Sequence, residues 1–246
     1  MQIKKKLDYP IWKTPYFCIV GLFVFVKLVK AGALTLLINK QFFNKKINLA
    51  LKFFTLIFYR DNKEEIGKKL LSCLIDLGPG YIKFGQALST RPDLVDKRTC
   101  QYLKKLQDDI EPFSSSIAKK IIETESQNLI DNIFSSFDEK PIANASVAQV
   151  HTAILKSGET VAVKLLKPNI RRKLFNDFIF FYWTSKCLEI AIPSLKRLKL
   201  SKNVEVLSEV SLNELDLTLE ASAAEELSEN FKDNPNYKVP KIYWEL

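Results

Sequence analysis

The chain has 246 residues, of which 47% are hydrophobic, so it can bury the core of one large domain or of two smaller ones and is not a disordered protein. Its four cysteines lie far apart and His151 is its only histidine, which excludes a disulfide framework and a Cys/His metal site. The formal net charge of +9 is unevenly spread, since the first 60 residues hold eleven Lys/Arg and one acid, Asp8, while the remainder is close to neutral.

Residues 1–60 combine this positive charge with large apolar side chains. The apolar run from Tyr16 to Val26 is eleven residues long, well short of the roughly twenty that span a bilayer, and Lys27 and Lys30 interrupt its continuation. A basic helix that lies on an anionic membrane surface fits this segment best, and a tilted span is the alternative. We therefore expect a peripheral or weakly anchored protein at the cytoplasmic face of the inner (cell) membrane.

Two other functions of a basic N-terminal segment fit less well. In a secretory signal, Lys27 and Lys30 would stand between the apolar core and a cleavage site at Ala31-Gly32-Ala33. In a nucleic-acid-binding arm we would expect more arginine, but Arg60 is the single arginine among the eleven basic residues. No nucleic-acid partner is expected.

Residues 61–137 are predicted to form a helical extension. Apolar residues at helical spacing predict a helix in KEEIGKKLLSCLIDLG, which the sequence Gly78-Pro79-Gly80 ends. Further helices are expected at about 81–88, 93–107 and 115–133.

Residues 138–246 differ, because strand patterns appear after Phe137. The stretches 141–155 and 160–166 predict a β-hairpin around the turn Lys156-Ser157-Gly158-Glu159. A helical pattern resumes in RRKLFNDFIFFYWTSKCLEIAI. A last helix is expected from about Ser211 to Phe231, with an apolar stripe at every fourth residue: Leu215, Leu219, Ala223, Leu227 and Phe231. The closing VPKIYWEL indicates a strand, so we expect the chain to be cut short there.

Lys164, in the second strand of this hairpin, is the first candidate for chemistry. Period-two geometry places Ala162 and Lys164 on one face and Val161 and Val163 on the other. Protein kinases use such a lysine to reach the α- and β-phosphates of ATP, although a lysine that only solvates a strand edge is the commoner case. The preceding loop, residues 143–146, has no glycine with which to wrap phosphates, so a nucleotide would be held differently.

The acids of NELDLTLEASAAEE are the second candidate. On a continuous helix, Asp216 and Glu220 are four apart and share a face, whereas Glu214 and Asp216 point in nearly opposite directions. They form either a solvated face or, for one acid, an ion pair with Lys164 like that of the helix αC glutamate in kinases. A hydrolase triad would need His151 as its base, and a structural histidine on a strand is the simpler interpretation.

Together these motifs resemble the UbiB family of atypical protein-kinase-like proteins, also called aarF-domain kinases, from about Leu77 to Trp244. LGPGYIKFGQALSTRPDLV resembles the family's KxGQ helix, with Lys83, Gly85 and Gln86 at its defining positions. PIANASVAQVHTA is similar to the alanine-rich loop, with Asn144 where a smaller residue is usual. VAVK and ELDLTLEASA resemble the nucleotide-pairing lysine and the ExD element.

The resemblance implies an α+β fold, in which a protein-kinase-like N-lobe with a small antiparallel sheet plus helices follows a helical KxGQ extension. It implies an ATPase or atypical kinase that supports ubiquinone biosynthesis and binds ATP or ADP with Mg, beneath the KxGQ helix as a lid. The implied catalytic residues are Lys83, Gln86, Glu214 and Asp216. The implied nucleotide-binding residues are Ala143, Ala145, Ser146, Lys164 and its helix αC partner Glu220.

The kinase C-lobe motifs, an HRDxxxxN-like loop and a DFG-like turn at the required position, are missing from the sequence. We therefore expect the C-lobe to be absent, and either supplied by a separately encoded chain or lost by truncation. The alternative is a non-catalytic membrane-bound protein that binds an isoprenoid lipid or serves as a scaffold for other ubiquinone-biosynthesis proteins. A third alternative is a remnant without function.

Overall fold

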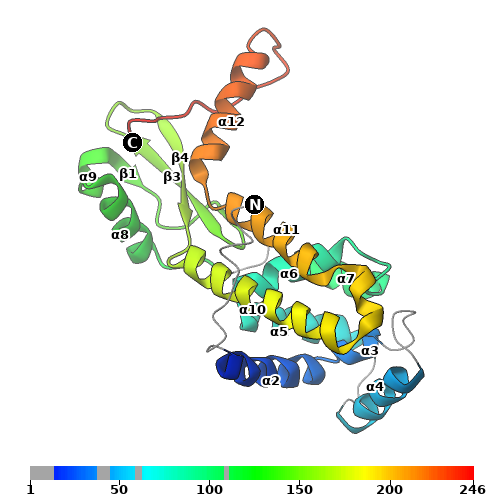
Figure 1. Cartoon of the computed structure of the whole chain (residues 1–246). Coiled ribbons are helices and arrows are strands. Elements are labelled where there is room, and N and C mark those ends of the chain that lie inside the picture. The colour runs from blue at the N-terminus through cyan, green and yellow to red at the C-terminus, as the bar shows by residue number, and fades with distance from the viewer. Residues whose placement is uncertain (1–13, 38–44, 59–62, 108–110) are drawn as a thin grey trace. The chain divides into compact units, whose positions relative to one another are not determined.

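The computed structural model describes residues 14–37, 45–58, 63–107 and 111–246 (Figure 1). The chain divides into two compact units, each made of two stretches: residues 1–110 with 170–209, and residues 111–169 with 210–246. These two units divide the chain differently from the three segments expected from its composition. Those three segments stay a prediction.

The first unit is helical. Its helices are α2 (Thr14–Lys30), α3 (Ala33–Leu37), α4 (Lys45–Phe58), α5 (Lys63–Leu77), α6 (Pro79–Ser89), α7 (Lys97–Lys104), α10 (Ile170–Ala191), the 3-10 helix η2 (Pro193–Leu198) and most of α11 (Leu200–Asn213). The predicted helix in KEEIGKKLLSCLIDLG is confirmed as α5. Helix α6 begins slightly earlier than predicted, because Pro79 occupies the first helical position, where a missing N–H costs nothing.

Helix α2 packs one side against α10. Phe17 lies 6.1 Å from Phe180 and 5.6 Å from Trp183, measured between ring centroids. The ring of Tyr81, in α6, meets the ring of Phe181, in α10, edge-on at a centroid distance of 4.7 Å. Burial of such rings stabilises the first unit. Among the described helices, none is long and apolar enough to cross a bilayer.

The second unit contains a small antiparallel sheet and helices. Its elements are α8 (Ser115–Ser126), α9 (Ile130–Ile133), β1 (Phe134–Phe137), β2 (Ala143–Asn144), β3 (Ala148–Leu155), β4 (Thr160–Leu166) and α12 (Leu217–Asn230). Strand β3 is central and pairs with the other three strands. The predicted hairpin is confirmed as β3 and β4, and Gly158 in its turn has φ of 92°, which glycine adopts without strain. Buried residues of α8 pack on the sheet: Ala118 and Ile122 against Phe134, Ala153, Leu155 and Leu165.

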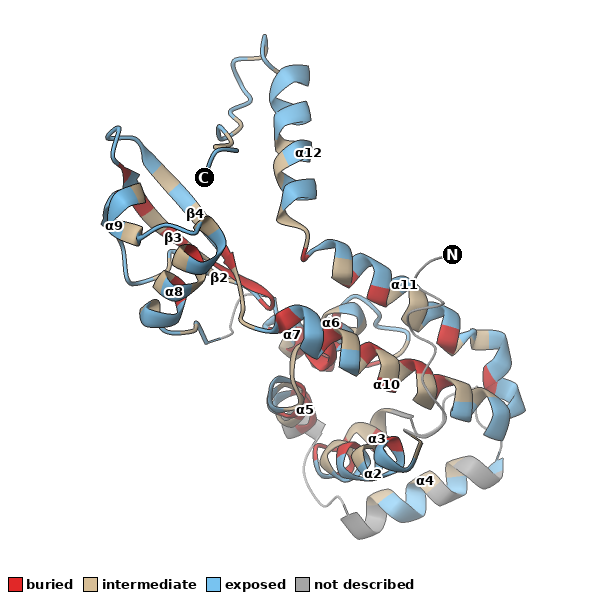
Figure 2. Cartoon of the chain, turned by 60° about the vertical axis from the view of Figure 1, so that its left-hand side comes forward, coloured by how far each residue is buried: buried red, intermediate tan, exposed pale blue. Residues whose placement is uncertain are grey.

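The predicted single helix from Ser211 to Phe231 is wrong, because the chain breaks between α11 and α12. Leu215 is buried at this break. Leu219 and Leu227 of the predicted apolar stripe are exposed, and Figure 2 shows α12 exposed or intermediate along its length. Equal spacing of apolar residues therefore did not correspond to a buried face.

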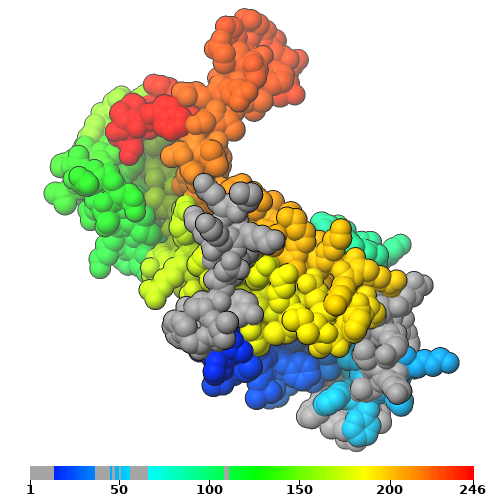
Figure 3. All heavy atoms as spheres, in the orientation of Figure 1, coloured from blue at the N-terminus to red at the C-terminus, as the bar shows by residue number. Residues whose placement is uncertain are grey.

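The predicted strand at the end of the chain is also wrong. Residues 238–246 lie outside any strand, and their side chains make the contacts instead. The hydroxyl of Tyr243 donates to Glu159 at 3.0 Å, and the indole N–H of Trp244 donates to Glu225 of α12 at 2.9 Å. In Figure 3 the C-terminal segment of the chain, in red, lies between the hairpin and α12.

Candidate functional site

Strand β4 presents Lys164 to solvent. Ala162 and Lys164 are exposed, whereas Val161 and Val163 pack against the buried cluster under α8, as the period-two pattern predicted. Lys164 stands opposite Val150 of β3 in the register of the hairpin. The small, exposed Ala162 therefore leaves the face beside the lysine open.

Lys164 forms an ion pair with Glu220 of α12. The ammonium nitrogen lies 2.6 Å from one carboxylate oxygen and 2.5 Å from the other. The side chains of Lys164 and Glu220 are 40% and 59% exposed, respectively, and an ion pair of this exposure contributes about 1 kcal/mol or less to stability. The pair is therefore a weak structural tie between β4 and α12, and it leaves the Lys164 side chain partly exposed.

Asp216 is the N-cap of α12. Its carboxylate accepts hydrogen bonds from the backbone N–H of Thr218 at 3.2 Å and from the hydroxyl of the same residue. The expectation that Glu214 and Asp216 occupy turns of a continuous helix is wrong, because Asp216 has an extended backbone and starts a new helix. The face shared by Asp216 and Glu220 on one helix is therefore not formed as predicted.

The alanine-rich loop forms a tight return into β3. Ala143 and Asn144 pair with Val150 and Gln149, and the N–H of Ala145 donates to the carbonyl of Ala148 at 2.8 Å. The side chain of Ser146 is buried. The loop is thus held by backbone hydrogen bonds beside the start of the hairpin.

Gly85 lets α6 pack closely within the first unit. A Cβ at this position would lie 2.8 Å from a methyl of Leu74 and closer still to one of Leu106. The neighbours of Gly85 are leucine side chains of α5 and of the segment after α7.

Gln86 and Lys83 lie near Gly85 on α6. The side-chain amide of Gln86 donates to the carbonyl of Leu106 at 2.8 Å, so this residue helps to hold the segment after α7. Lys83 is only 8% exposed. Both residues belong to the first unit, whereas the other seven predicted site residues belong to the second. Within the second unit, the structure joins Lys164 and Glu220 directly.

Asp177 was missed by the sequence interpretation. From α10 its carboxylate accepts the N–H of Gly80, in the first turn of α6, at 2.9 Å. A Cβ on Gly80 would collide with this side chain. Burial raises the pKa of Asp177 to about 6, although the Gly80 N–H and Lys173 oppose the shift. The residues are 97 positions apart, so no local pattern could have revealed the contact.

His151 is a structural residue, as the simpler interpretation held. It is fully buried and stacks on Phe137 at 4.8 Å. Because the carbonyl of Asp138 can only accept, Nδ1 carries the proton and donates to it at 2.8 Å. Nε2 accepts from the amide of Gln149 at 2.7 Å, and the N–H of Phe113 fixes the orientation of that amide by donating to its oxygen at 3.0 Å. With both nitrogens bound, the ring is not placed as a general base.

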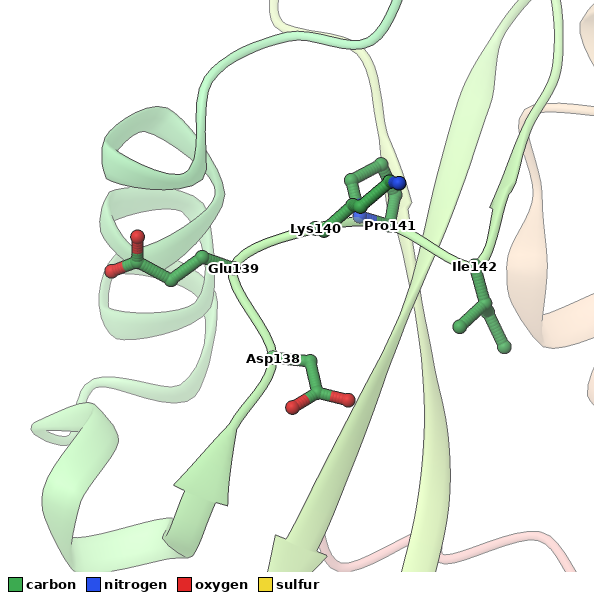
Figure 4. A pocket seen from close by; sticks show the side chains of 5 residues that line it. All are labelled: Asp138, Glu139, Lys140, Pro141 and Ile142. Carbon is green, nitrogen blue, oxygen red and sulfur yellow. The ribbon is translucent and has the colours of Figure 1, made fainter.

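One pocket of the second unit is lined by residues outside the predicted set. Figure 4 shows a pocket lined by Asp138, Glu139, Lys140, Pro141 and Ile142, none of which is a predicted site residue. Within the part of the chain that the structure describes, no group of three or more His, Cys, Asp or Glu residues could hold a metal ion.

An antiparallel sheet whose hairpin lysine pairs with a glutamate on a neighbouring helix is the arrangement of a protein-kinase-like N-lobe. Residues 105–246, more than half of the chain, match the ABC1 atypical kinase-like domain. The chain belongs to the ABC1 atypical kinase-like family, which confirms the resemblance and the α+β fold expected from the sequence.

Relatives named "Probable protein kinase UbiB" are similar over most of the chain. The protein of Aliivibrio fischeri is 40% identical over 194 residues, which cover 77% of this chain and 36% of the relative. That of Shewanella woodyi is 41% identical over 187 residues, covering 75% of this chain and 34% of the relative. The chain therefore spans about a third of the length of these curated relatives.

One solved structure is also similar, that of Rv3197 with erythromycin from Mycobacterium tuberculosis. It is 25% identical, with a TM-score of 0.40, over 80% of this chain and 47% of that chain.

Proposed function

We propose that this chain contributes the Lys164–Glu220 part of a Mg-adenine-nucleotide site in a UbiB-type ATPase or atypical kinase that supports ubiquinone biosynthesis. The observation that supports the proposal is the ion pair of Lys164 with Glu220, 56 residues away on α12. In kinases the equivalent pair orients the lysine toward the α- and β-phosphates.

The residues present suit the phosphate end of such a ligand. Lys164 is partly exposed, its charge complements phosphate, and the neighbouring Ala162 is small and exposed. Glu220 holds the lysine extended from β4, while the loop of Ala143, Ala145 and Ser146 would border the nucleotide. When bound, Mg would neutralise phosphate charge; we propose that its ligands come from a C-lobe beyond this chain or encoded separately.

Nucleotide binding tests this proposal. We expect a fluorescent ADP analogue to bind the purified chain, and Lys164→Ala to weaken binding by about tenfold or more, because a charge-assisted contact to phosphate is lost. Lys119→Ala is the matched control, since Lys119 forms an ion pair of similar exposure with Glu139 in the same unit, at 2.7 Å. Equal affinity of wild type and Lys164→Ala would refute the assignment.

The second candidate is a non-catalytic, membrane-bound scaffold or lipid-binding protein at the cytoplasmic face of the inner membrane. The exposed apolar residues of α2 support it. In this case the chain binds lipid vesicles and binds no nucleotide. It also retains other ubiquinone-biosynthesis proteins or an isoprenoid lipid. This candidate is favoured if the wild-type chain binds vesicles but no nucleotide. Lys164→Ala should then retain the partner proteins or the lipid as well as the wild type does.

A further inference from the structure

Helix α2 carries an apolar surface on the side that faces away from the core. Its inner side is fixed by Phe17 and Val24, which are buried in the cluster with Phe180 of α10. The exposed side chains on the remainder of the helix form what we call the α2 outer face: Tyr16, Ile19, Leu22, Phe23, Phe25 and Val26. Ile19 and Leu22 are 71% and 65% exposed. An apolar surface of this continuity indicates an interaction site.

Helix α4, in the same unit, carries exposed apolar side chains of its own. Leu49 and Phe53 are four residues apart on α4 and are 70% and 61% exposed. Figures 1 and 2 both place α4 near the α3 end of α2. The exposed apolar side chains thus come from two neighbouring helices.

The charges around this surface select its partner. Residues 14–58 contain no Asp or Glu. Lys27 lies with its ammonium 5.1 Å from the ring centroid of Phe23, and Lys30 is exposed at the end of α2. A second copy of this surface would bring these lysines together with no acid from α2 or α4 to compensate them, whereas an anionic lipid surface offers both apolar chains and negative headgroups.

We propose that the α2 outer face, with Leu49 and Phe53 of α4, inserts into the interfacial layer of an anionic bilayer, with α2 parallel to the membrane plane. The lysines extend their ammonium groups to the headgroups while the apolar side chains lie below them. This proposal deepens the membrane association proposed above and is independent of the nucleotide site.

Co-sedimentation with vesicles tests which residues enter the bilayer. The full chain is mixed with phosphatidylcholine vesicles that contain or lack phosphatidylglycerol. We expect binding to the anionic vesicles, and the double variant Leu22→Ser/Phe23→Ser to weaken it by about tenfold or more, because two large apolar groups no longer leave water. The matched control is Leu129→Ser/Ile142→Ser, which removes two exposed apolar side chains of the second unit and should bind as wild type does.

A fluorescent label gives an independent measurement. Cys18 is exposed on α2, Cys187 is exposed on α10, and Cys73 and Cys100 are buried. In the variant Cys187→Ser, an environment-sensitive label on Cys18 should shift to the blue on anionic vesicles. The same label on Leu129→Cys, in a background of Cys18→Ser/Cys187→Ser, should not shift.

The outcomes separate the two proposals. If the wild type binds neither kind of vesicle, membrane association and its deepening both fail. If the wild type binds anionic vesicles but Leu22→Ser/Phe23→Ser binds equally well, with native circular dichroism, membrane association stands and the α2 outer face is refuted. A dimer in sedimentation velocity that this double variant converts to a monomer would assign the face to a second copy and overturn the bilayer proposal.

Discussion

The carboxylate of Asp177 accepts the backbone N–H of Gly80 at 2.9 Å, which joins α10 to the first turn of the helix that carries Lys83 and Gln86. Gly80 is required for this contact, since any Cβ there would overlap Asp177. The N-terminus of α6 is thus held by a partly buried acid rather than by a local cap.

This acid predicts a pH dependence of stability. The pKa of Asp177 rises from 3.8 to about 6 on folding, mainly through burial, so the folded chain binds the proton more tightly than the unfolded chain. The resulting stabilisation, up to about 3 kcal/mol, is complete below pH ~4 and is lost as the pH rises through about 6. Asp177→Asn keeps an acceptor but does not titrate, so its advantage over wild type should grow between pH 4 and 7 in urea unfolding.

Asp177→Ala serves as the control for the hydrogen bond. It removes the acceptor and should be less stable than Asp177→Asn at every pH, because the N–H of Gly80 loses its partner. Parallel stability curves for wild type and Asp177→Asn across this pH range would contradict the prediction.

Gly85→Ala should destabilise the first unit by about 1–3 kcal/mol, because the added methyl would force Leu74 and Leu106 apart. Gly21→Ala is the control, since a Cβ there meets only the ring of Phe180 at 3.8 Å, an ordinary contact. Thermal unfolding should separate the two variants, and equal melting temperatures would show that the leucines move aside at no cost.

The Lys164–Glu220 pair should contribute little to stability. A double-mutant cycle with Lys164→Met and Glu220→Gln should give a coupling free energy of about 1 kcal/mol or less, because both side chains are exposed. A coupling energy of several kcal/mol in chemical denaturation would instead make the pair a structural element.

Gln149→Leu should destabilise the second unit by about 2–4 kcal/mol, because the buried His151 and the backbone of Phe113 lose their hydrogen-bond partner. Thr160→Val at the exposed start of β4 is the control and should change stability by less than about 0.5 kcal/mol. Chemical denaturation of both variants checks this prediction. Equal losses of unfolding free energy would mean that any substitution in the sheet is destabilising and that the Gln149 hydrogen bonds have no special role.

The chain by itself should not hydrolyse ATP at a measurable rate, because its sequence has neither the HRDxxxxN-like loop nor a DFG-like turn after the hairpin. A phosphate-release assay with Mg and ATP checks this expectation. Mg-dependent turnover that disappears in Lys164→Ala would overturn it.

Local periodicity was sufficient for much of the fold. Alternation by two defined the hairpin and placed Lys164 on its open face, and helical spacing defined α5 and α6. The pattern failed between Asn213 and Leu217, because Asp216 can cap a new helix as readily as it can occupy an old one.

The sequence by itself determined the basic apolar N-terminal segment, the hairpin and the family motifs, because these depend on composition and on neighbours a few residues apart. Only the tertiary structure decided that Lys164 meets Glu220, that Asp177 holds Gly80, and that Gln149 satisfies His151 from an adjacent position on the same face of β3. It also decided which side of α2 faces the core and which side is left apolar and exposed. The Lys164–Glu220 and Asp177–Gly80 contacts join elements far apart in the chain, and packing selects them rather than local propensity.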